Sequence, residues 1–276
     1  MKKKISSFFL KKSTIICGSI IILLVLISLI SPLFETVNYQ HTDIAIKNMS
    51  PNNLHWFGTD LLGRDMWSRV WFGLKISLLI SVICTLISQI FGLIIGSIAG
   101  YYGGMLDTII MSIVDIGVCI PSLIYVTIIM IYFGNGIPQM ILAITLSSWM
   151  QTARIARSRI LQYKNQEFIL YTKIQGASSL KIIFKQIFPN ISGQFITDLI
   201  TTIPMIIFTE SYLSFIGLGV SSPMVSLGQL CKTGLNMYRL YPYQFFIPAI
   251  VLITLVLCFY IIGNNLRDHL DHKVVS

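Results

Sequence analysis

The feature that most constrains this chain is a run of 31 residues without a charge, from position 76 to position 106. A helix rises about 1.5 Å per residue, so about 20 apolar residues cross the hydrocarbon core of a bilayer. Over the whole chain 54% of the residues are hydrophobic and 11% are charged, whereas a soluble globular domain is about 25% charged. This composition excludes a soluble domain and a disordered chain, and it predicts a polytopic membrane protein.

Six apolar segments are expected to cross the membrane, which predicts an all-α integral membrane fold with six transmembrane helices. The expected spans are residues 14–34, 76–106, 108–133, 138–152, 194–215 and 245–264. The first ends at Ser31-Pro32 without the small-residue cleavage site of a signal peptide, which predicts an uncleaved anchor. The chain then divides into an N-terminal segment, a first span, an extracytoplasmic segment, a core transmembrane domain and a tail, which are residues 1–13, 14–34, 35–75, 76–264 and 265–276.

The basic residues predict the orientation of these spans. With the N-terminus inside, the inner segments hold 14 of the 20 Lys and Arg residues, and the outer segments hold the other 6. Because Lys and Arg gather on the cytoplasmic side of membrane proteins, both termini are expected in the cytoplasm. The net charge of +9 is therefore interpreted as basic residues on the cytoplasmic side, and no nucleic-acid partner is expected.

The longest inner loop, residues 154–190, is expected to carry two short amphipathic helices. Gly176 follows the first helix at an end position where a positive φ is tolerated, and Ser178 or Ser179 can cap the second. Pro189 is expected to end that second helix. From the residues alone, the pair either lies on the membrane surface or docks a soluble partner. The second helix has an apolar stripe formed by Leu180, Ile183, Phe184 and Ile187.

This loop resembles the EAA coupling motif of ATP-binding-cassette (ABC) importer permeases, on Glu167-Phe-Ile, Gly176-Ala-Ser and Phe188-Pro-Asn. It departs from the common form at residues 170–172, where Leu-Tyr-Thr stands in place of Glu-Ala-Ala. The resemblance implies a cytoplasmic coupling helix that docks into a groove of an ATPase subunit. The residues that it marks for coupling to the ATPase are Glu167, Thr172, Gln175, Gly176, Ala177, Ser178 and Pro189.

Three further stretches resemble the second, C-type permease of dipeptide, oligopeptide and nickel importers. They are residues 55–78, which include Gly-Thr-Asp-Leu-Leu-Gly-Arg-Asp, and residues 210–219 and 263–271. The resemblance implies a type I ABC importer permease fold in a prokaryotic cell membrane. It also implies a second homologous permease, two ABC ATPases and an extracytoplasmic solute-binding protein as partners, besides the lipid bilayer.

The same resemblance predicts a permease that is not an enzyme and has no catalytic residues, cofactor or metal of its own. ATP and Mg would be bound by the ATPase partners. Motifs for zinc proteases, serine hydrolases and nucleotide binding are missing from the sequence, which agrees with this expectation. Di- and oligopeptides are the first expected substrates, and nickel or a metal chelate is the alternative. A secondary transporter or channel is a further alternative, which internal repeats and membrane-depth ionisable groups would favour.

The extracytoplasmic segment carries a charged signature, which is expected to form a structural elbow against the partner permease or the binding protein. Asp65 and Arg69 are expected to pair at an i,i+4 spacing on a helix. The residues of this signature are Asp60, Gly63, Arg64, Asp65, Ser68 and Arg69.

Three polar residues inside the spans are candidates for the solute path or a subunit contact: Asp115, Glu210 and Ser214. A carboxylate at membrane depth costs about 2.5–3.5 kcal/mol, so it needs a partner or a water-filled cavity. Asp115 is expected either to pair with a basic residue of the next loop or to contact the path. Glu210 is expected on the path or in an intersubunit hydrogen bond.

Small and cyclic residues within the spans make two further predictions. Gly92, Gly96 and Gly100 repeat every four residues on one helix face, which predicts close packing against another helix. Pro121 interrupts helical hydrogen bonding and is expected to kink the third span. The five cysteines are expected to be small core residues, because they form no C-x-x-C pair.

Overall fold

The structure, a computed structural model, describes residues 11–34 and 38–271. Within these ranges the regular elements are all helices, and one isolated β-bridge joins Thr59 to Asp65. This confirms the predicted all-α fold class. The helices are α2 (Lys12–Phe34), η1 (Ile44–Ile46), α3 (Met66–Tyr102), α4 (Gly104–Cys119), α5 (Ser122–Phe133), α6 (Ile137–Lys164), α7 (Glu167–Ile174), α8 (Ser179–Ile182), the π-helical turn η2 (Ile183–Ile187), α9 (Phe188–Ile216), α10 (Leu227–Leu235) and α11 (Tyr243–Asp271).

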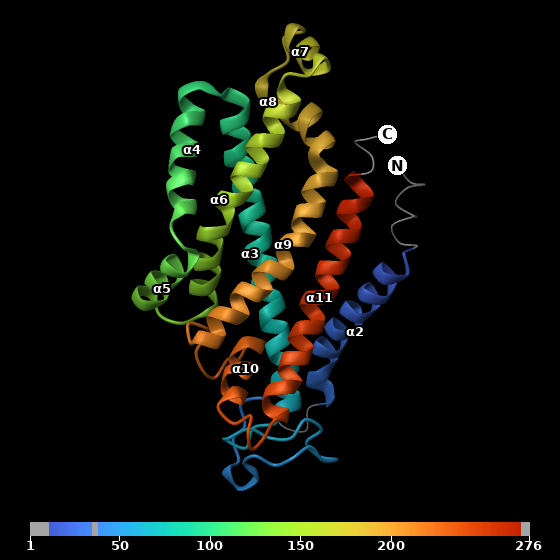
Figure 1. Ribbon diagram of the computed structural model, residues 1–276, viewed down its shortest axis with the longest axis vertical. Coiled ribbons are helices and arrows are strands. Elements are labelled where there is room, and N and C mark those ends of the chain that lie inside the picture. The colour runs from blue at the N-terminus through green and yellow to red at the C-terminus, as the bar shows by residue number, and fades with distance from the viewer. Residues whose placement is uncertain (1–10, 35–37, 272–276) are drawn as a thin grey trace.

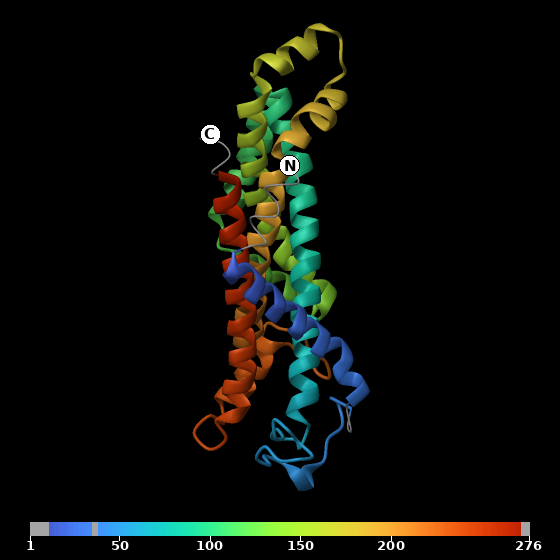
Figure 2. The ribbon, with the colours of Figure 1, turned by 90° about the vertical axis from the view of Figure 1, so that its right-hand side faces the viewer.

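The long helices form an elongated bundle (Figure 1). Helices α3, α6, α9 and α11 run along its long axis, and α2 crosses it obliquely, as Figure 2 shows. The region of α7 and α8 projects at one end, whereas residues 38–65 and α10 lie at the other end. The bundle therefore has two chemically distinct ends that long helices connect.

Helix α3 makes its most extensive contact with α6, and three glycines of α3 face that helix. A Cβ on Gly96 would lie 2.8 Å from the Ala156 Cβ, and one on Gly100 would lie 2.9 Å from the Ile160 Cβ. Both distances are shorter than the closest approach of two non-bonded carbon atoms. The glycines therefore permit the close approach of the two helices, as their spacing predicted.

Helix α3 begins at Met66, ten residues before the expected start of the second span. Met66, Val70 and Leu74 lie one turn apart, and all three are buried with residues of α9, α10 and α11. The helix therefore extends into residues 66–75, which are charged in part, because one face of this stretch is apolar and buried. The division between an extracytoplasmic segment 35–75 and a span starting at 76 does not match this helix.

The expected third span, residues 108–133, is broken in two. Helix α4 ends at Cys119 and α5 starts at Ser122, and the two are bent by 83°. Ile120, the residue before Pro121, is extended at the break, since the proline ring excludes the preceding residue from helical geometry. The break confirms the position of the predicted kink, although the bend is far larger than a kinked helix would have.

The described residues do not confirm the predicted count of six spans. Within residues 11–34 and 38–271, four helices are long and apolar enough to cross a membrane, or five if α4 and α5 form one span. Helix α6 has 28 residues but is not among them. Its second half carries three arginines, Arg154, Arg157 and Arg159, which interrupt the apolar sequence that a span requires.

The beginning of α2 lies beside the end of α11. The Asn265 amide donates hydrogen bonds to the hydroxyls of Ser13 at 3.0 Å and Thr14 at 3.1 Å. Lys11 Nζ lies 4.0 Å from the Asp268 carboxylate. The two ends of the described chain therefore share one side of the bundle.

We expect Gly96→Leu to destabilise the protein by about 1–3 kcal/mol, because the new side chain overpacks the contact between α3 and α6. The matched control is Gly18→Leu in α2, where an added Cβ meets no described atom within 4 Å. The melting temperature of each variant in detergent, followed by size-exclusion chromatography, checks this. Equal melting temperatures would contradict the packing role of the glycine row.

Candidate functional site

The candidate site is the segment of α7, α8 and η2, residues 167–187, which we call the projecting element. Helix α6 ends at Lys164, and α7 begins three residues later. Gly176 has a φ of +80°, a conformation that glycine adopts readily, and it turns the chain between α7 and α8. Figure 2 shows that the element extends along the bundle axis beyond the last turn of α11.

Buried isoleucines anchor the projecting element to the bundle. Ile169 of α7, Ile182 of α8 and Ile187 of η2 are buried in one cluster with Tyr101 of α3 and Ile160 of α6. Burial of one such side chain contributes about 1.5–3 kcal/mol. The element is therefore packed onto α3 and α6 and is not a free loop.

The outer face of the element is apolar and exposed. Tyr171, Ile174 and Phe184 expose 64%, 84% and 63% of their surface. A large apolar patch at the tip of a protein typically marks a contact with a partner or a membrane. The other large apolar residues that this face exposes are Phe168, Leu170 and Leu180.

The predicted apolar stripe of the second helix is divided between two faces. Ile183 and Ile187 are buried against the bundle, whereas Leu180 and Phe184 point outward. Residues 183–187 form a π-helical turn, in which the wider winding shifts the positions that follow. The α-helical spacing behind the prediction therefore does not apply across this turn.

Six of the seven residues marked for coupling lie together in and after α7. Glu167 is exposed in the first turn of α7, and the Thr172 hydroxyl donates to the Phe168 carbonyl at 2.8 Å. Gln175 and Gly176 are exposed at the turn, and Ala177 packs against the isoleucine cluster. Ser178 is the N-cap residue of α8 by position, but its side chain makes no capping hydrogen bond among the described residues.

Pro189, the seventh residue, does not end a helix. Helix α8 continues through η2 directly into α9, and Pro189 lies in the first turn of α9. A proline lacks the N–H of a regular α-helix and clashes with the carbonyl four residues earlier. The π-helical turn before Pro189 widens the winding at this point, so the helix continues past the proline.

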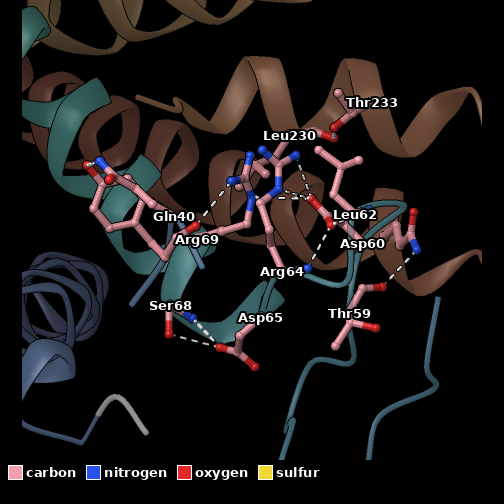
Figure 3. A network of polar contacts seen from close by, with 12 residues as sticks. Gln40, Thr59, Asp60, Leu62, Arg64, Asp65, Ser68, Arg69, Leu230 and Thr233 are labelled. Carbon is pink, nitrogen blue, oxygen red and sulfur yellow. Dashed lines mark hydrogen bonds and ion pairs between the residues drawn. The ribbon is translucent and has the colours of Figure 1, made fainter. Parts of the chain in front are cut away.

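At the opposite end of the bundle, the charged signature forms a network within the chain (Figure 3). Asp60 accepts hydrogen bonds from its neighbours Leu62 and Arg64 through their backbone N–H groups, both at 2.9 Å. The Arg64 guanidinium lies 2.7 Å from the same carboxylate, and Arg69 Nε lies 3.6 Å from it. Gly63 has a φ of +69° and packs against the backbone of Asp43. The signature is thus a folded segment of this chain, and its expected contact with a partner permease or binding protein stays a prediction.

The expected ion pair between Asp65 and Arg69 is wrong. Asp65 is the N-cap of α3 and accepts hydrogen bonds from the Ser68 N–H at 2.8 Å and the Ser68 hydroxyl at 2.9 Å. Its other oxygen lies 3.0 Å from His55 Nδ1. Capping competes with the ion pair because Asp65 precedes the helix and does not belong to its first turn. Arg69 instead donates to the Tyr39 carbonyl at 3.3 Å and faces Asp60.

Asp115 pairs with a basic residue, which confirms one of its two expected roles. Arg154 of α6 donates to the Asp115 carboxylate of α4 at 2.6 Å. Two similar pairs went unrecognised in the sequence: Arg157 donates to Asp107 at 2.5 and 2.6 Å, and Arg159 pairs with Asp198 of α9. Their signal was present in the acidic residues Asp107 and Asp198, which the count of Lys and Arg did not include.

Glu210 lies inside the chain and not on a surface that a solute or a second subunit could reach. It is fully buried and accepts hydrogen bonds from the Ser77 and Ser214 hydroxyls, both at 2.8 Å. The N–H of Leu227, at the start of α10, donates to the Ser77 hydroxyl at 3.3 Å. Glu210 and Ser214 therefore join α9 to α3 and α10, which differs from the expected contact with the path or another subunit.

The cysteines match their prediction at four of five positions. Cys17, Cys84, Cys231 and Cys258 are buried, and all five cysteines are free thiols. Cys119 is exposed because it ends α4 at the break before Pro121. Among the described residues there is no group of three or more His, Cys, Asp or Glu residues that could hold a metal ion.

The family described as "Binding-protein-dependent transport system inner membrane component" matches residues 92–276, and the chain belongs to this family. It is a non-catalytic membrane subunit, as the motifs predicted.

Individual relatives match most of the chain. The oligopeptide transport system permease protein OppC of Bacillus subtilis (strain 168) is 39% identical to this chain. The alignment covers 92% of this chain and 84% of the relative. The dipeptide transport system permease protein DppC of the same organism is 37% identical, with 96% of this chain and 84% of the relative covered. OppC of Escherichia coli (strain K12) is 37% identical, and the alignment covers 92% of this chain and 85% of the relative.

A solved structure shares the fold. The MetNI methionine ABC transporter in an inward-facing conformation matches with a TM-score of 0.60 at 18% identity. The match covers 74% of this chain and 97% of the other. At this identity it supports the predicted type I importer permease fold and no more.

We expect Ile187→Ala to lower stability by about 2–5 kcal/mol, because it removes a fully buried anchor of the projecting element. Phe184→Ala, in the same π-helical turn, should leave stability nearly unchanged, since that ring is exposed. Thermal unfolding of both variants in detergent separates the two faces. An equal loss of stability in the two variants would contradict the division into an anchoring face and a free face.

Proposed function

We propose that this chain is the permease subunit of an ATP-driven importer of di- and oligopeptides, and that the projecting element docks an ABC ATPase. The chain pairs with a second homologous permease, and a solute-binding protein delivers the substrate at the end formed by residues 38–65. Two ATPase subunits bind ATP and Mg, and this chain binds no cofactor. Both termini lie in the cytoplasm of a prokaryotic cell, on the same side as the projecting element.

The observation that carries this proposal is an exposed apolar face on a firmly anchored element. Tyr171, Ile174 and Phe184 present their side chains outward, while the isoleucine cluster fixes the element to α3 and α6. An amphipathic helix that docks into a groove presents its apolar residues in this way. Anchoring is what a coupling element needs, because a loose loop would absorb a displacement instead of passing it on.

The alternative of a membrane-surface element is less well supported. The element extends along the bundle axis beyond the end of α11, whereas a surface-lying helix would sit level with the ends of the spans (Figure 2). Lys173, Lys181 and Lys185 would suit anionic lipids, but they also suit an acidic rim around a protein groove.

The charge distribution supports the orientation. The arginines of α6 and the lysines of the projecting element lie at one end of the bundle, and that end also holds the contact between the start of α2 and the end of α11. Basic residues gather on the cytoplasmic side. The names of the relatives, which are oligopeptide and dipeptide permeases, support peptides over nickel as the substrate.

We expect Ile174→Glu to abolish co-purification of the ATPase and at least about 90% of ATP-driven uptake, because a carboxylate would enter an apolar contact. Ile44→Glu is the matched control for co-purification of the ATPase, since Ile44 is also highly exposed (72%) but lies in the opposite end segment. Retained ATPase binding by Ile174→Glu would contradict docking at this face.

Proteoliposomes with the whole complex test the substrate. ATP-dependent uptake of a labelled dipeptide should be competed by unlabelled peptides and not by Ni²⁺. Uptake by this chain alone, driven by an ion gradient without ATP, would instead identify a secondary transporter.

A further inference from the structure

A polar cavity of about 660 Å³ lies between α6, α9 and α11, and we call it the inner cavity. Nine of its ten lining residues are polar or charged, with Ile155 the exception. A cavity so lined is suited to a hydrated, polar ligand. The residues that the argument uses are Arg154, Arg159, Gln162, Gln194, Asp198 and Arg267.

The lining of the inner cavity carries more positive than negative charge. It contains three guanidinium groups and one carboxylate, that of Asp198. Arg159 pairs with Asp198 across the cavity floor, and Arg154 is held by Asp115, which lies outside the lining. Three guanidinium groups line the cavity, and a guanidinium fork matches the geometry of a carboxylate.

The walls of the inner cavity are the two helices that the projecting element connects. Helix α6 leads into the element, and α9 continues from it through η2. The pair between Arg159 and Asp198 joins the two walls. A displacement of the element therefore acts directly on the spacing of the walls, which links the cavity to the docking face.

Polar groups continue from the cavity floor into the bundle. A small void next to the pair of Arg159 and Asp198 is also lined by Gln89 of α3. Gln89 is buried and donates to the Thr202 hydroxyl at 3.2 Å, while its carbonyl oxygen has no hydrogen-bond partner among the described residues. Gln89 thus adds one polar group beside the inner cavity, in a void whose other lining residues are mainly apolar.

A second groove has the opposite chemistry. It measures about 550 Å³ and is lined on α3 and α6 almost wholly by apolar residues, including Phe91, Leu142 and Trp149. Acyl chains suit that groove, whereas nine of the ten residues that line the inner cavity are polar or charged. The contrast favours a soluble anion over a lipid as the ligand of the inner cavity.

We propose that the inner cavity binds the C-terminal carboxylate of a peptide during import, with Arg267 and Arg154 as its guanidinium partners. The pair of Arg159 and Asp198 closes the floor beneath it, and Gln162 and Gln194 offer amide N–H groups at the rim. This inference rests on the proposed function and adds the chemical group that the permease itself recognises.

The test compares ATP-driven uptake of a peptide and of its C-terminal amide into proteoliposomes that hold the whole complex. We expect Arg267→Gln to reduce the ratio of acid uptake to amide uptake about tenfold, since a charge-assisted hydrogen bond is lost. Arg267→Lys should restore part of the ratio. Arg239→Gln, at an exposed arginine of the opposite end, should keep the wild-type ratio. The binding protein is the same throughout, so a changed ratio reports on this chain.

A second variant tests the inference independently, in case Arg267→Gln does not fold. Gln194→Glu places a repelling carboxylate in the cavity and should reduce acid uptake while amide uptake persists. An unchanged ratio in both Arg267→Gln and Gln194→Glu overturns the inference, although peptide uptake by the wild type still supports the proposed function. Loss of a bound anionic phospholipid from Arg267→Gln, with an unchanged ratio, also overturns it and assigns the cavity to a lipid phosphate. A wild-type complex without ATP-driven peptide uptake overturns both proposals.

Discussion

The close approach of α3 and α6 is the contact on which the rest of the structure depends. Gly92, Gly96 and Gly100 leave room for the backbone of α6, and the two helices run side by side toward the projecting element. Their inner ends supply Tyr101 and Ile160 to the cluster that receives the isoleucines of the element. A wider spacing between α3 and α6 would separate these two residues and leave the element without a common base.

From that base, an unbroken helical path runs through the length of the bundle. The chain passes from α8 through η2 into α9 without a loop, and α9 reaches the opposite end at Ile216. There the Glu210 carboxylate bonds to Ser77 of α3, whose hydroxyl in turn accepts from the start of α10. A displacement applied at the projecting element can therefore reach α10 through packed helix and hydrogen bonds alone, which is the mechanical property that an ATP-driven permease requires.

The features that the sequence could predict are those that depend on local spacing. The membrane class follows from charge-free runs, and the packing of α3 on α6 follows from glycines four residues apart, because both signals survive whatever the tertiary context is. Pro121 and the projecting element were located for the same reason. The resemblance to importer permeases added the family, which composition alone could not supply.

The features that it could not predict depend on where a helix begins, how it is wound and which helix packs beside it. Asp65 was expected to pair with Arg69, but its position before the helix made it a cap. Pro189 was expected to stop a helix that a π-helical turn instead carries past it. Glu210 was expected on the solute path or in an intersubunit hydrogen bond, yet three serines of this chain provide the hydrogen bonds that a buried carboxylate needs.

The central claim is that the projecting element and α9 move as one body, and a distance measurement within the assembled complex tests it most directly. Spin labels at Lys185 in η2 and Met205 in α9, both exposed, report the length of this helical path. The account predicts the same distance with and without a bound ATP analogue. A change of about 5 Å, one helical turn, would show that the path between these positions bends and would contradict the account.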